Sequence, residues 1–435
     1  MQTLFTEHQL SSPPIREANR ILRHCVHCGF CLATCPTYQL LGDELDSPRG
    51  RIYLIKDMLE NERNPSDEVV KHIDRCLSCL SCMTTCPSNV NYMHLVDRGR
   101  AYIEEHHRRP APDRFVRALL AGILPRAKFF RWALQLARAV EPLQRFLPQR
   151  IRAMTTLAKS VTVHQYNETS QSLFPAVGEI KGRVGLLSGC VQTVMGNDIN
   201  QATISLLTRL GYEVWILERE PCCGAIEQHL GKESRTRKRI TENVKNWKVL
   251  MKEQRIEAII VNASGCGTMI KDYAYLLREN ASLSGAATFI SQHTLDITEF
   301  LDTCDLTPLS FRTDNDFTIA CHNPCSMQHG QNITEQPAAL LRRFGFRVTH
   351  VPEAHMCCGS AGTYNLLQPE LANRLGQHKA QQIRSLQAHI VATGNLGCIA
   401  QMRRYLDVPV RHTTELLDWA SYGQSTLNIN DIDSH

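Results

Sequence analysis

The chain of 435 residues is 43% hydrophobic and 21% charged, with a formal net charge of +5, so we expect two or three domains with buried cores. Its eighteen cysteines exclude a small disulfide-stapled scaffold at this length and indicate metal ligation in a reducing compartment. The first residues carry no secretory signal, and no apolar run of about 18 residues predicts a membrane-spanning helix. We therefore expect a cytoplasmic protein whose contact with a membrane is peripheral or made through a partner.

Residues 1–100 form a predicted helical ferredoxin-like domain, because they contain two copies of the pattern C-x2-C-x2-C-x3-C-P. This pattern is typical of bacterial ferredoxins with two [4Fe–4S] clusters, in which the fourth cysteine of each copy ligates the other cluster. The sequence therefore predicts one cluster held by Cys25, Cys28, Cys31 and Cys86 and a second held by Cys76, Cys79, Cys82 and Cys35. Two zinc sites or a disulfide framework are the alternatives, but zinc sites do not require eight thiolates at this spacing.

A helix is predicted between the two copies, beginning at Pro48, with Ile52 and Ile55 at helical spacing. Arg49 and Arg51 stand in its first turn. Their guanidinium groups either offset the negative charge of a thiolate-ligated cluster or form an exposed pair at the helix N-terminus. The sequence leaves both interpretations open.

Residues 101–180 are predicted to form a basic connector of short helices. Between His106 and Ser160, twelve Lys and Arg residues are opposed only by Asp113 and Glu141, a net charge of +10, and large apolar residues are interleaved with them. Such a stretch either lies on an anionic membrane surface or packs on the protein with a solvated outer face. We favour packing or a contact with a partner subunit. No nucleic acid is expected, because no reading motif accompanies the charge.

From residue 181 onward the chain is a duplication, with a first Cys-Cys-Gly repeat at 181–300 and a second at 301–435. Strands alternate with helices in each repeat, which predicts α/β units with mostly parallel sheets. The predicted fold class is therefore α+β/α, with a helical two-cluster ferredoxin-like domain followed by two α/β domains.

Each repeat places four cysteines at strand-to-helix turns, and corresponding cysteines lie 132 to 135 residues apart. They are Cys190, Cys222, Cys223 and Cys266 in the first repeat and Cys325, Cys357, Cys358 and Cys398 in the second. Because such turns gather at the carboxyl edge of a parallel sheet, each set is a candidate site for a further iron–sulfur cluster or a zinc ion. Packing of small buried side chains is the alternative, and it is our interpretation of Cys304 and Cys321, which lie outside the pattern.

The tandem motifs, the segment from Pro48 to Ile55 and the two repeats together resemble the iron–sulfur subunits of flavin-linked 2-hydroxy-acid dehydrogenases, those of glycolate oxidase (glycolate dehydrogenase) above all. Segments 37–46, 263–267 and 357–364 carry the resemblance most strongly. It implies partner subunits that bind FAD and oxidise glycolate to glyoxylate. This chain would then carry electrons toward a quinone or another acceptor, in a complex that is peripheral on the inner membrane.

Related families share the Cys-Cys-Gly repeat, among them lactate-utilisation proteins, an anaerobic glycerol-3-phosphate dehydrogenase subunit and heterodisulfide reductase subunits. Lactate or glycerol 3-phosphate therefore stays an alternative substrate of the partner. A reductase that acts on a disulfide at its own Cys-Cys-Gly site and a zinc-binding assembly module are further alternatives. The reductase is disfavoured, because neither repeat has a cysteine three residues from Cys266 or Cys398, as heterodisulfide reductase-like repeats have.

No catalytic residue is predicted on this chain. It contains no G-x-G-x-x-G that opens a strand–turn–helix unit, no P-loop and no evident nucleophile triad. We therefore expect the hydride chemistry on the partner flavoprotein and one-electron transfer on this chain.

Overall fold

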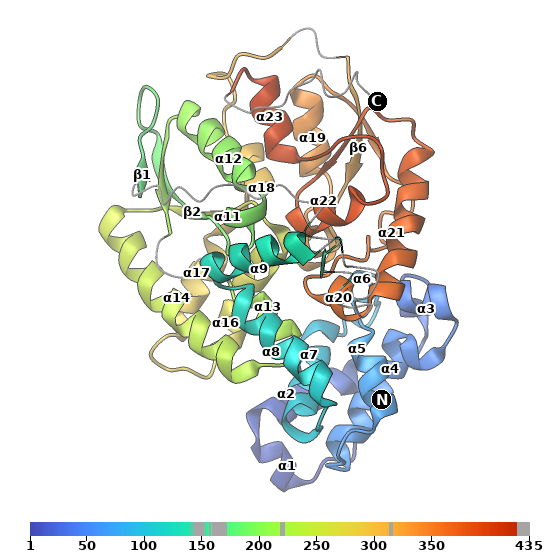
Figure 1. Ribbon diagram of the computed structural model, residues 1–435. Coiled ribbons are helices and arrows are strands. Elements are labelled where there is room, and N and C mark those ends of the chain that lie inside the picture. Colours follow the sequence, from blue (N-terminus) through green and yellow to red (C-terminus); the bar gives the residue numbers. More distant parts are fainter. Residues whose placement is uncertain are drawn as a thin grey trace.

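The computed structural model describes residues 1–140, 172–217, 222–312 and 316–423, together with residues 142, 152, 154, 155 and 158. Figure 1 shows the N-terminal helical domain at one end of the molecule and the two α/β repeats beyond it. The predicted fold class is confirmed, since a helical domain precedes two units with mostly parallel sheets. Most of the predicted connector beyond residue 140, and residues 424–435 of the second repeat, lie outside the described residues.

The N-terminal domain is built from short helices around one apolar core. Pro13, Pro36 and Pro48 begin α2, α3 and α4, where the fixed φ angle of proline suits the first helical position. The helix predicted from Pro48 is present, and Ile52 and Ile55 are buried in the core against α2 and α7. The elements are α1 (Glu7–Ser11), α2 (Pro13–His24), η1 (Phe30–Leu32), α3 (Pro36–Leu41), η2 (Glu44–Asp46), α4 (Pro48–Glu60), α5 (Asp67–Asp74), α6 (Ser81–Thr84) and α7 (Tyr92–His106).

Two helices of the connector are described, α8 (Ala111–Ile123) and α9 (Ala127–Val140). One face of each is buried. Leu120 of α8 packs with Leu230 and Leu367, and Phe130 and Leu134 of α9 join an apolar cluster that contains residues of both repeats. The inner faces of α8 and α9 therefore pack on the protein, as one of the interpretations favoured from the sequence has it.

The first repeat contains a five-stranded sheet in the order β1-β3-β2-β4-β5. Strand β1 is antiparallel to β3 and the other pairs are parallel. The inner strand β4 is buried along its whole length, as a strand with helices on both faces should be. The elements are β1 (Leu173–Phe174), β2 (Gly182–Leu187), α11 (Gln192–Met195), α12 (Asn197–Arg209), β3 (Tyr212–Ile216), α13 (Ala225–His229), α14 (Glu233–Gln254), β4 (Ala258–Val261), α15 (Ser264–Lys271), α16 (Tyr273–Leu276), α17 (Ser284–Gln292), β5 (Thr294–Asp296) and α18 (Ile297–Thr303).

The second repeat contains an all-parallel sheet in the order β7-β6-β8-β9. This is the order of β3-β2-β4-β5 in the first repeat, so the duplication seen in the sequence is also a duplication of topology. The turns that carry the cysteines follow the carboxyl ends of β2, β3 and β4 in the first sheet and of β6, β7 and β8 in the second. The elements are β6 (Thr318–His322), η4 (Ser326–Gly330), α19 (Gln336–Arg343), β7 (Arg347–His350), α20 (Tyr364–Leu367), α21 (Pro369–Arg384), β8 (Ile390–Thr393), α22 (Leu396–Met402), β9 (Val410–His412) and α23 (Thr413–Ala420).

A buried histidine makes the last helix sensitive to acid. Nδ1 of His412 accepts a hydrogen bond from the backbone N–H of Thr414 at 3.2 Å and so caps α23, which requires a neutral imidazole. Burial lowers the pKa of His412 from 6.5 to about 4. As the pH falls below 6.5, His412 binds a proton in the unfolded chain but not in the folded one. The contribution of this residue to the free energy of unfolding is therefore complete above pH 6.5 and is lost toward pH 4.

We therefore expect the wild-type chain to lose about 2 kcal/mol of unfolding free energy between pH 7 and pH 5 relative to His412→Asn, because asparagine keeps a capping oxygen without this titration. Urea unfolding of both proteins at the two pH values measures the difference. An equal loss in the two proteins would show that His412 does not carry this acid sensitivity.

Candidate metal centres

The first cysteine motif folds into a tight loop that carries Cys25, Cys28 and Cys31. Cys25 ends α2, and Cys31 lies in the single turn of η1. Between them His27 and Gly29 have positive φ angles of 57° and 85°. The left-handed conformation reverses the chain between the thiols, and glycine adopts it without steric cost.

The second motif repeats this backbone around Cys76, Cys79 and Cys82. Ser78 and Leu80 have positive φ angles of 52° and 64°, and they stand at the same motif positions as the two left-handed residues of the first loop. The backbone N–H of Ser78 donates to Sγ of Cys76 at 3.5 Å. Both motifs therefore form the same loop, although the second uses leucine where the first uses glycine.

The last cysteine of each motif lies beside the loop of the other. Cys86 interacts electrostatically with Cys25, and Cys35 does so with Cys79 and Cys82. A cavity at the first loop is lined by cysteines of both motifs, namely Cys25, Cys28, Cys31, Cys82 and Cys86. The structure thus brings cysteines of both motifs together. The two sets predicted from the sequence are called here the first ferredoxin set (Cys25, Cys28, Cys31, Cys86) and the second ferredoxin set (Cys35, Cys76, Cys79, Cys82).

The two ferredoxin sets differ in exposure. Cys28 of the first set is exposed, and the neighbouring apolar side chains of Val26 and Phe30 are exposed as well. In the second set Cys35, Cys76 and Cys82 are buried and Cys79 is half-buried. A partner protein can therefore approach the first set directly, whereas the second lies inside the molecule.

Arg51 is buried beside the second ferredoxin set. Its side chain is 1% exposed, and its guanidinium group forms an ion pair with Asp46 at 3.3 Å and lies 3.9 Å from Sγ of Cys35. Arg49, in contrast, has a 32% exposed side chain and pairs with Glu44 at the surface. The exposed-pair interpretation therefore fits Arg49 and is wrong for Arg51.

Asp46 is the centre of this buried network. Its carboxylate also pairs with Arg75 at 2.7 Å and with His72 at 3.0 Å. Among the described residues, Asp43, Asp46 and His72 form the one group of three or more His, Cys, Asp or Glu residues whose ligand atoms all lie within 4.8 Å of one another. The guanidinium partners of Asp46 already neutralise it, so we do not interpret this group as a metal site.

A second guanidinium group supports the same cysteines. Arg100 of α7 donates to the carbonyl of Cys76 and to the hydroxyl of Ser78, both at 2.6 Å. Burial acts to raise the pKa of Cys76, but the charges of Arg51 and Arg100 outweigh it and lower that pKa. These two buried arginines therefore favour the thiolate form of Cys76.

The first Cys-Cys-Gly set (Cys190, Cys222, Cys223, Cys266) gathers at the carboxyl edge of the first sheet. The thiol of Cys190 interacts directly with that of Cys222, and Cys223 interacts with Cys266. The Asn243 side chain donates to the carbonyl of Cys222 at 3.0 Å, and the Tyr273 hydroxyl donates to that of Cys223 at 2.8 Å. Side chains of α14 and α16 therefore fix the backbone of the cysteine pair.

The second Cys-Cys-Gly set (Cys325, Cys357, Cys358, Cys398) gathers in the same way in the second repeat. Cys357 contacts Cys325 and Cys358, which in turn contacts Cys398. Gly359 follows the pair with a φ of 86°, and a Cβ atom there would lie 2.6 Å from the carbonyl oxygen of Ala372. Glycine is required at this position by both conformation and space.

A buried lysine accompanies the second Cys-Cys-Gly set. Lys379 of α21 is fully buried, and its Nζ donates to the carbonyl of Glu353 at 2.8 Å. Burial lowers the pKa of Lys379, while Cys325, Cys358 and Cys357 act to raise it. The amine is therefore placed to offset negative charge on these thiols.

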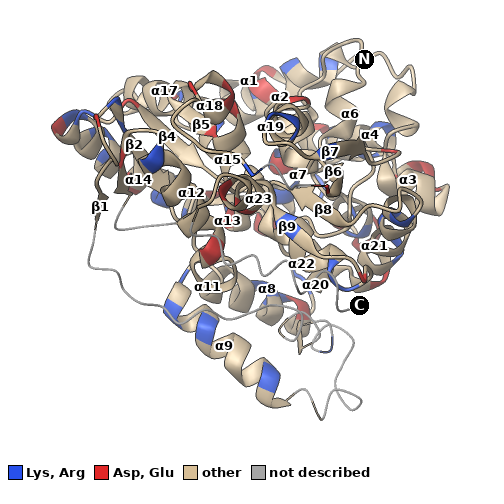
Figure 2. Ribbon diagram, turned by 90° about the horizontal axis from the view of Figure 1, so that it is seen from above, with Lys and Arg blue, Asp and Glu red and all other residues tan. Residues whose placement is uncertain are grey.

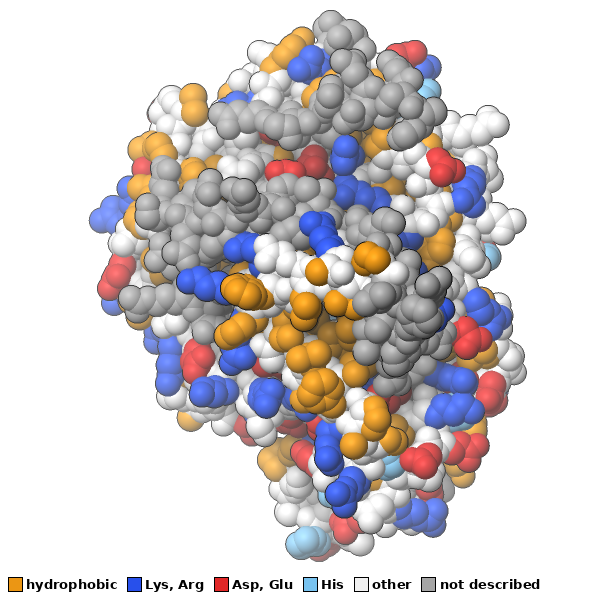
Figure 3. Space-filling view, in the orientation of Figure 1, with side chains coloured by type: hydrophobic (Ala, Val, Ile, Leu, Met, Phe, Trp, Pro, Cys, Tyr) orange, Lys and Arg blue, Asp and Glu red, His pale blue; other side chains and the backbone are white. Residues whose placement is uncertain are grey.

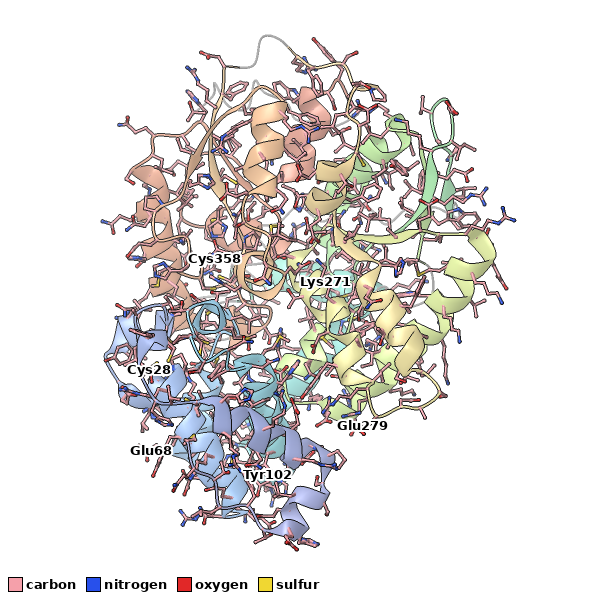
Figure 4. The ribbon with its side chains drawn as sticks, turned by 180° about the vertical axis from the view of Figure 1, so that it is seen from behind. Cys28, Glu68, Tyr102, Lys271, Glu279 and Cys358 are labelled. Atoms are coloured by element: carbon pink, nitrogen blue, oxygen red, sulfur yellow. The ribbon has the colours of Figure 1, made fainter. Side chains whose placement is uncertain are left out.

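The second Cys-Cys-Gly set adjoins the second ferredoxin set across the junction between two domains. Cys79 interacts electrostatically with Cys325 and Cys357, and Leu77 packs in one apolar cluster with them. In Figure 4, Cys358 lies near the N-terminal domain, while Cys28 lies within that domain. A hydrogen bond of 2.8 Å between Thr84 and His329 also crosses the junction.

The four sets fit metal binding by the chemistry of their donors. Burial raises the pKa values of Cys79 and Cys82 well above the usual range, and neighbouring thiols add to the effect. Buried thiols this close together cannot all ionise near neutral pH unless a cation binds between them. Four thiolates are the donor set of [4Fe–4S] clusters and of structural zinc. The spacing favours clusters at the ferredoxin sets, and the Cys-Cys-Gly sets fit either.

Three supporting residues were not found from the sequence. Arg100, Lys379 and Tyr92, whose hydroxyl lies 3.6 Å from Sγ of Cys76, stand in helices at positions that resemble surface or core positions. Only long-range packing brings them to the cysteines, so no local pattern marks them.

Comparisons with known proteins agree with this arrangement. The model of a 4Fe-4S dicluster domain matches residues 21–90, and that of a cysteine-rich domain matches residues 184–271 and 319–403. The glycolate oxidase iron–sulfur subunit of Escherichia coli (strain K12) is 39% identical over 97% of this chain and 99% of its own length. Lactate utilization protein A of Oceanobacillus iheyensis is 27% identical over 54% of this chain and 96% of its own length. A crystal structure of a hypothetical protein from Helicobacter pylori matches with a TM-score of 0.55 at 11% identity, over 99% of this chain and 76% of that one, and supports the fold alone.

Proposed function

Because the chain belongs to the family of glycolate oxidase iron–sulfur subunits, we propose that it carries electrons from FAD-binding subunits, which oxidise glycolate to glyoxylate, toward a quinone or another acceptor. The observation that carries this proposal is that the last cysteine of each N-terminal motif lies beside the loop of the other. The chain contributes an electron-transfer subunit to an oxidoreductase complex, and the hydride chemistry belongs to the partner.

We propose that each ferredoxin set holds one [4Fe–4S] cluster, with Cys25, Cys28, Cys31 and Cys86 as the ligands of one and Cys35, Cys76, Cys79 and Cys82 as those of the other. When bound, such clusters supply one-electron transfer at a potential tuned by nearby charge and burial. The exposed loop around Cys28 offers the flavoprotein a close approach. Arg51 and Arg100 stabilise thiolate charge at the buried set.

We further propose that the two Cys-Cys-Gly sets each hold an additional iron–sulfur cluster or a zinc ion. The direct thiol contacts in both sets support this, as does the buried amine of Lys379 beside the second. If these cysteines only filled space in the core, small apolar side chains would serve equally well at their positions. A buried charged amine beside them would then have no role.

Replacing Cys357 with serine should lower the metal content of the purified complex by the complement of one site, because the second Cys-Cys-Gly set then lacks a thiolate. Iron, zinc and acid-labile sulfide per chain measure the loss. Cys321→Ser is the matched control, since Cys321 is equally buried but lies outside the sets. Wild-type metal content and activity in Cys357→Ser would show that this set serves packing only.

Contact with the inner membrane is proposed to be peripheral. Within the described parts of the chain, no helix is long and apolar enough to cross a membrane. Attachment through a surface of this chain or through a partner therefore fits these residues, and the surface that we favour is described below.

The proposed function is tested by electron paramagnetic resonance on the native complex, purified without oxygen, before and after addition of glycolate. We expect signals of reduced [4Fe–4S] clusters after glycolate. Signals that appear only with lactate or glycerol 3-phosphate would show that the partner oxidises that compound instead of glycolate. The match to lactate utilization protein A makes lactate the second candidate. Clusters that stay oxidised with all three substrates, but are reduced by dithionite, would contradict the proposal.

A further inference from the structure

Helices α8 and α9 carry large apolar side chains on their outer faces as well as on their inner ones. The inner side chains, such as Leu120 and Phe130, are buried. The outer side chains are exposed, and they form what we call the α8–α9 face: Phe115, Leu119, Phe129, Trp132 and Leu136. Figure 3 shows a patch of apolar side chains in this part of the molecule.

The outer residues of α9 follow helical periodicity. Phe129, Trp132 and Leu136 stand at positions i, i+3 and i+7, so they line one stripe along the helix. Trp132 is 75% exposed and Phe129 is 60% exposed. A helix on the surface of a soluble protein ordinarily has polar residues in this stripe, and a contiguous exposed apolar patch marks an interaction site.

The charges around the α8–α9 face are of one sign. Arg114 on α8, Lys128 on α9 and Arg126 between the two helices are exposed. The guanidinium group of Arg126 lies 6.0 Å from the ring centre of Phe129. Asp113 is the one acidic residue between positions 108 and 140, and its carboxylate pairs with the buried guanidinium groups of Arg117 and Arg109. In Figure 2, α9 projects from the body of the molecule with Lys and Arg along its length.

We propose that the α8–α9 face docks on a lipid bilayer with anionic headgroups. Tryptophan and phenylalanine on an arginine-rich helix are the residues that lie at the boundary between headgroups and acyl chains. The basic side chains around them match the phosphate charge of the headgroups. A protein partner would need an acidic groove shaped for a projecting helix, whereas a membrane meets a projecting, positive and apolar stripe with no such shape.

This inference identifies the surface for the peripheral membrane contact proposed above, and it does not depend on which substrate the complex oxidises. Its test measures binding alone. The reduction of the clusters by glycolate is measured in the absence of lipid. That experiment can therefore succeed or fail independently of the membrane-binding test.

The test is co-sedimentation of the full chain with vesicles made of equal amounts of phosphatidylglycerol and phosphatidylcholine. The double variant Phe129→Ser/Trp132→Ser should bind about tenfold more weakly than the wild type, because it removes two exposed aromatic side chains without opening a cavity. Phe289→Ser, on α17, is the matched control, since Phe289 is 46% exposed outside the face, and it should bind as the wild type does.

Binding to vesicles of phosphatidylcholine alone should be weaker, and added salt should weaken binding to the anionic vesicles. Equal binding by the wild type and the double variant would overturn the proposal, as would equal binding to both kinds of vesicle. If the wild type binds neither vesicle and the double variant instead loses its flavoprotein subunits, the face is a subunit interface and the proposal is wrong.

Discussion

Replacing Cys28 with alanine should abolish electron transfer through this chain while leaving its fold intact. Cys28 is exposed in a surface loop, so the truncated side chain opens no cavity in the core. Its proposed role is that of a cluster ligand in the first ferredoxin set. Loss of an outer-shell partner alone costs about 10- to 100-fold in activity, so the loss of a ligand should exceed that range.

The measurement is dye-coupled oxidation of glycolate by the complex, together with the spectrum of the clusters and the circular dichroism of the chain. Cys304→Ser is the control. Cys304 donates to the carbonyl of Phe300 at 3.2 Å, and serine can keep that hydrogen bond, so turnover should be unchanged. Wild-type turnover in Cys28→Ala would remove the first ferredoxin set from the electron route and with it the central part of the proposed function.

Replacing Arg51 with methionine should destabilise the N-terminal domain by about 3 to 5 kcal/mol. The change removes the buried ion pair with Asp46 and the hydrogen bond that Nε of Arg51 donates to the carbonyl of His72 at 2.7 Å. Methionine preserves most of the side-chain volume, so the loss reports on charge and hydrogen bonding rather than on a cavity. Cys76 also loses one of the two charges that favour its thiolate.

Arg49→Met provides the matched control two positions earlier in the same helix. Its ion pair joins side chains that are 32% and 45% exposed, and exposed pairs contribute about 1 kcal/mol or less. Urea unfolding followed by cluster absorbance and circular dichroism compares the two variants. Equal, small losses in both would contradict the buried role that we assign to Arg51.

The sequence predicted those features that depend on local spacing. The aliphatic run 258–261, which ends at a turn, is typical of a short buried strand, and β4 (Ala258–Val261) occupies it. The motif alone predicts how the eight ferredoxin cysteines divide into two ligand sets, and it places the last cysteine of each motif beside the loop of the other, where the structure has it. The constant offset between the repeats predicts a duplication, and the strand order that the two sheets share agrees with it.

The features that the sequence did not predict depend on contacts between distant segments. Nothing in the sequence around Lys379 distinguishes a fully buried amine from a solvated one. The proximity of Cys79 to Cys325 results from the docking of one domain on another. The sequence of α9 shows that basic and apolar residues are interleaved, but it does not indicate which apolar residues face the core. Burial of Phe130 and exposure of Trp132 settle that question.

The junction between the second ferredoxin set and the second Cys-Cys-Gly set has a consequence for biogenesis. Leu77 of the N-terminal domain packs in one apolar cluster with Cys325 and Cys357, so this part of the second Cys-Cys-Gly set is covered where the domains meet. Under the proposed function, metal for this set would be delivered before the domains close, and maturation and closure would follow that order. Because metal binding is coupled to folding in such sites, a newly made chain deprived of iron should stall as an open, protease-sensitive species.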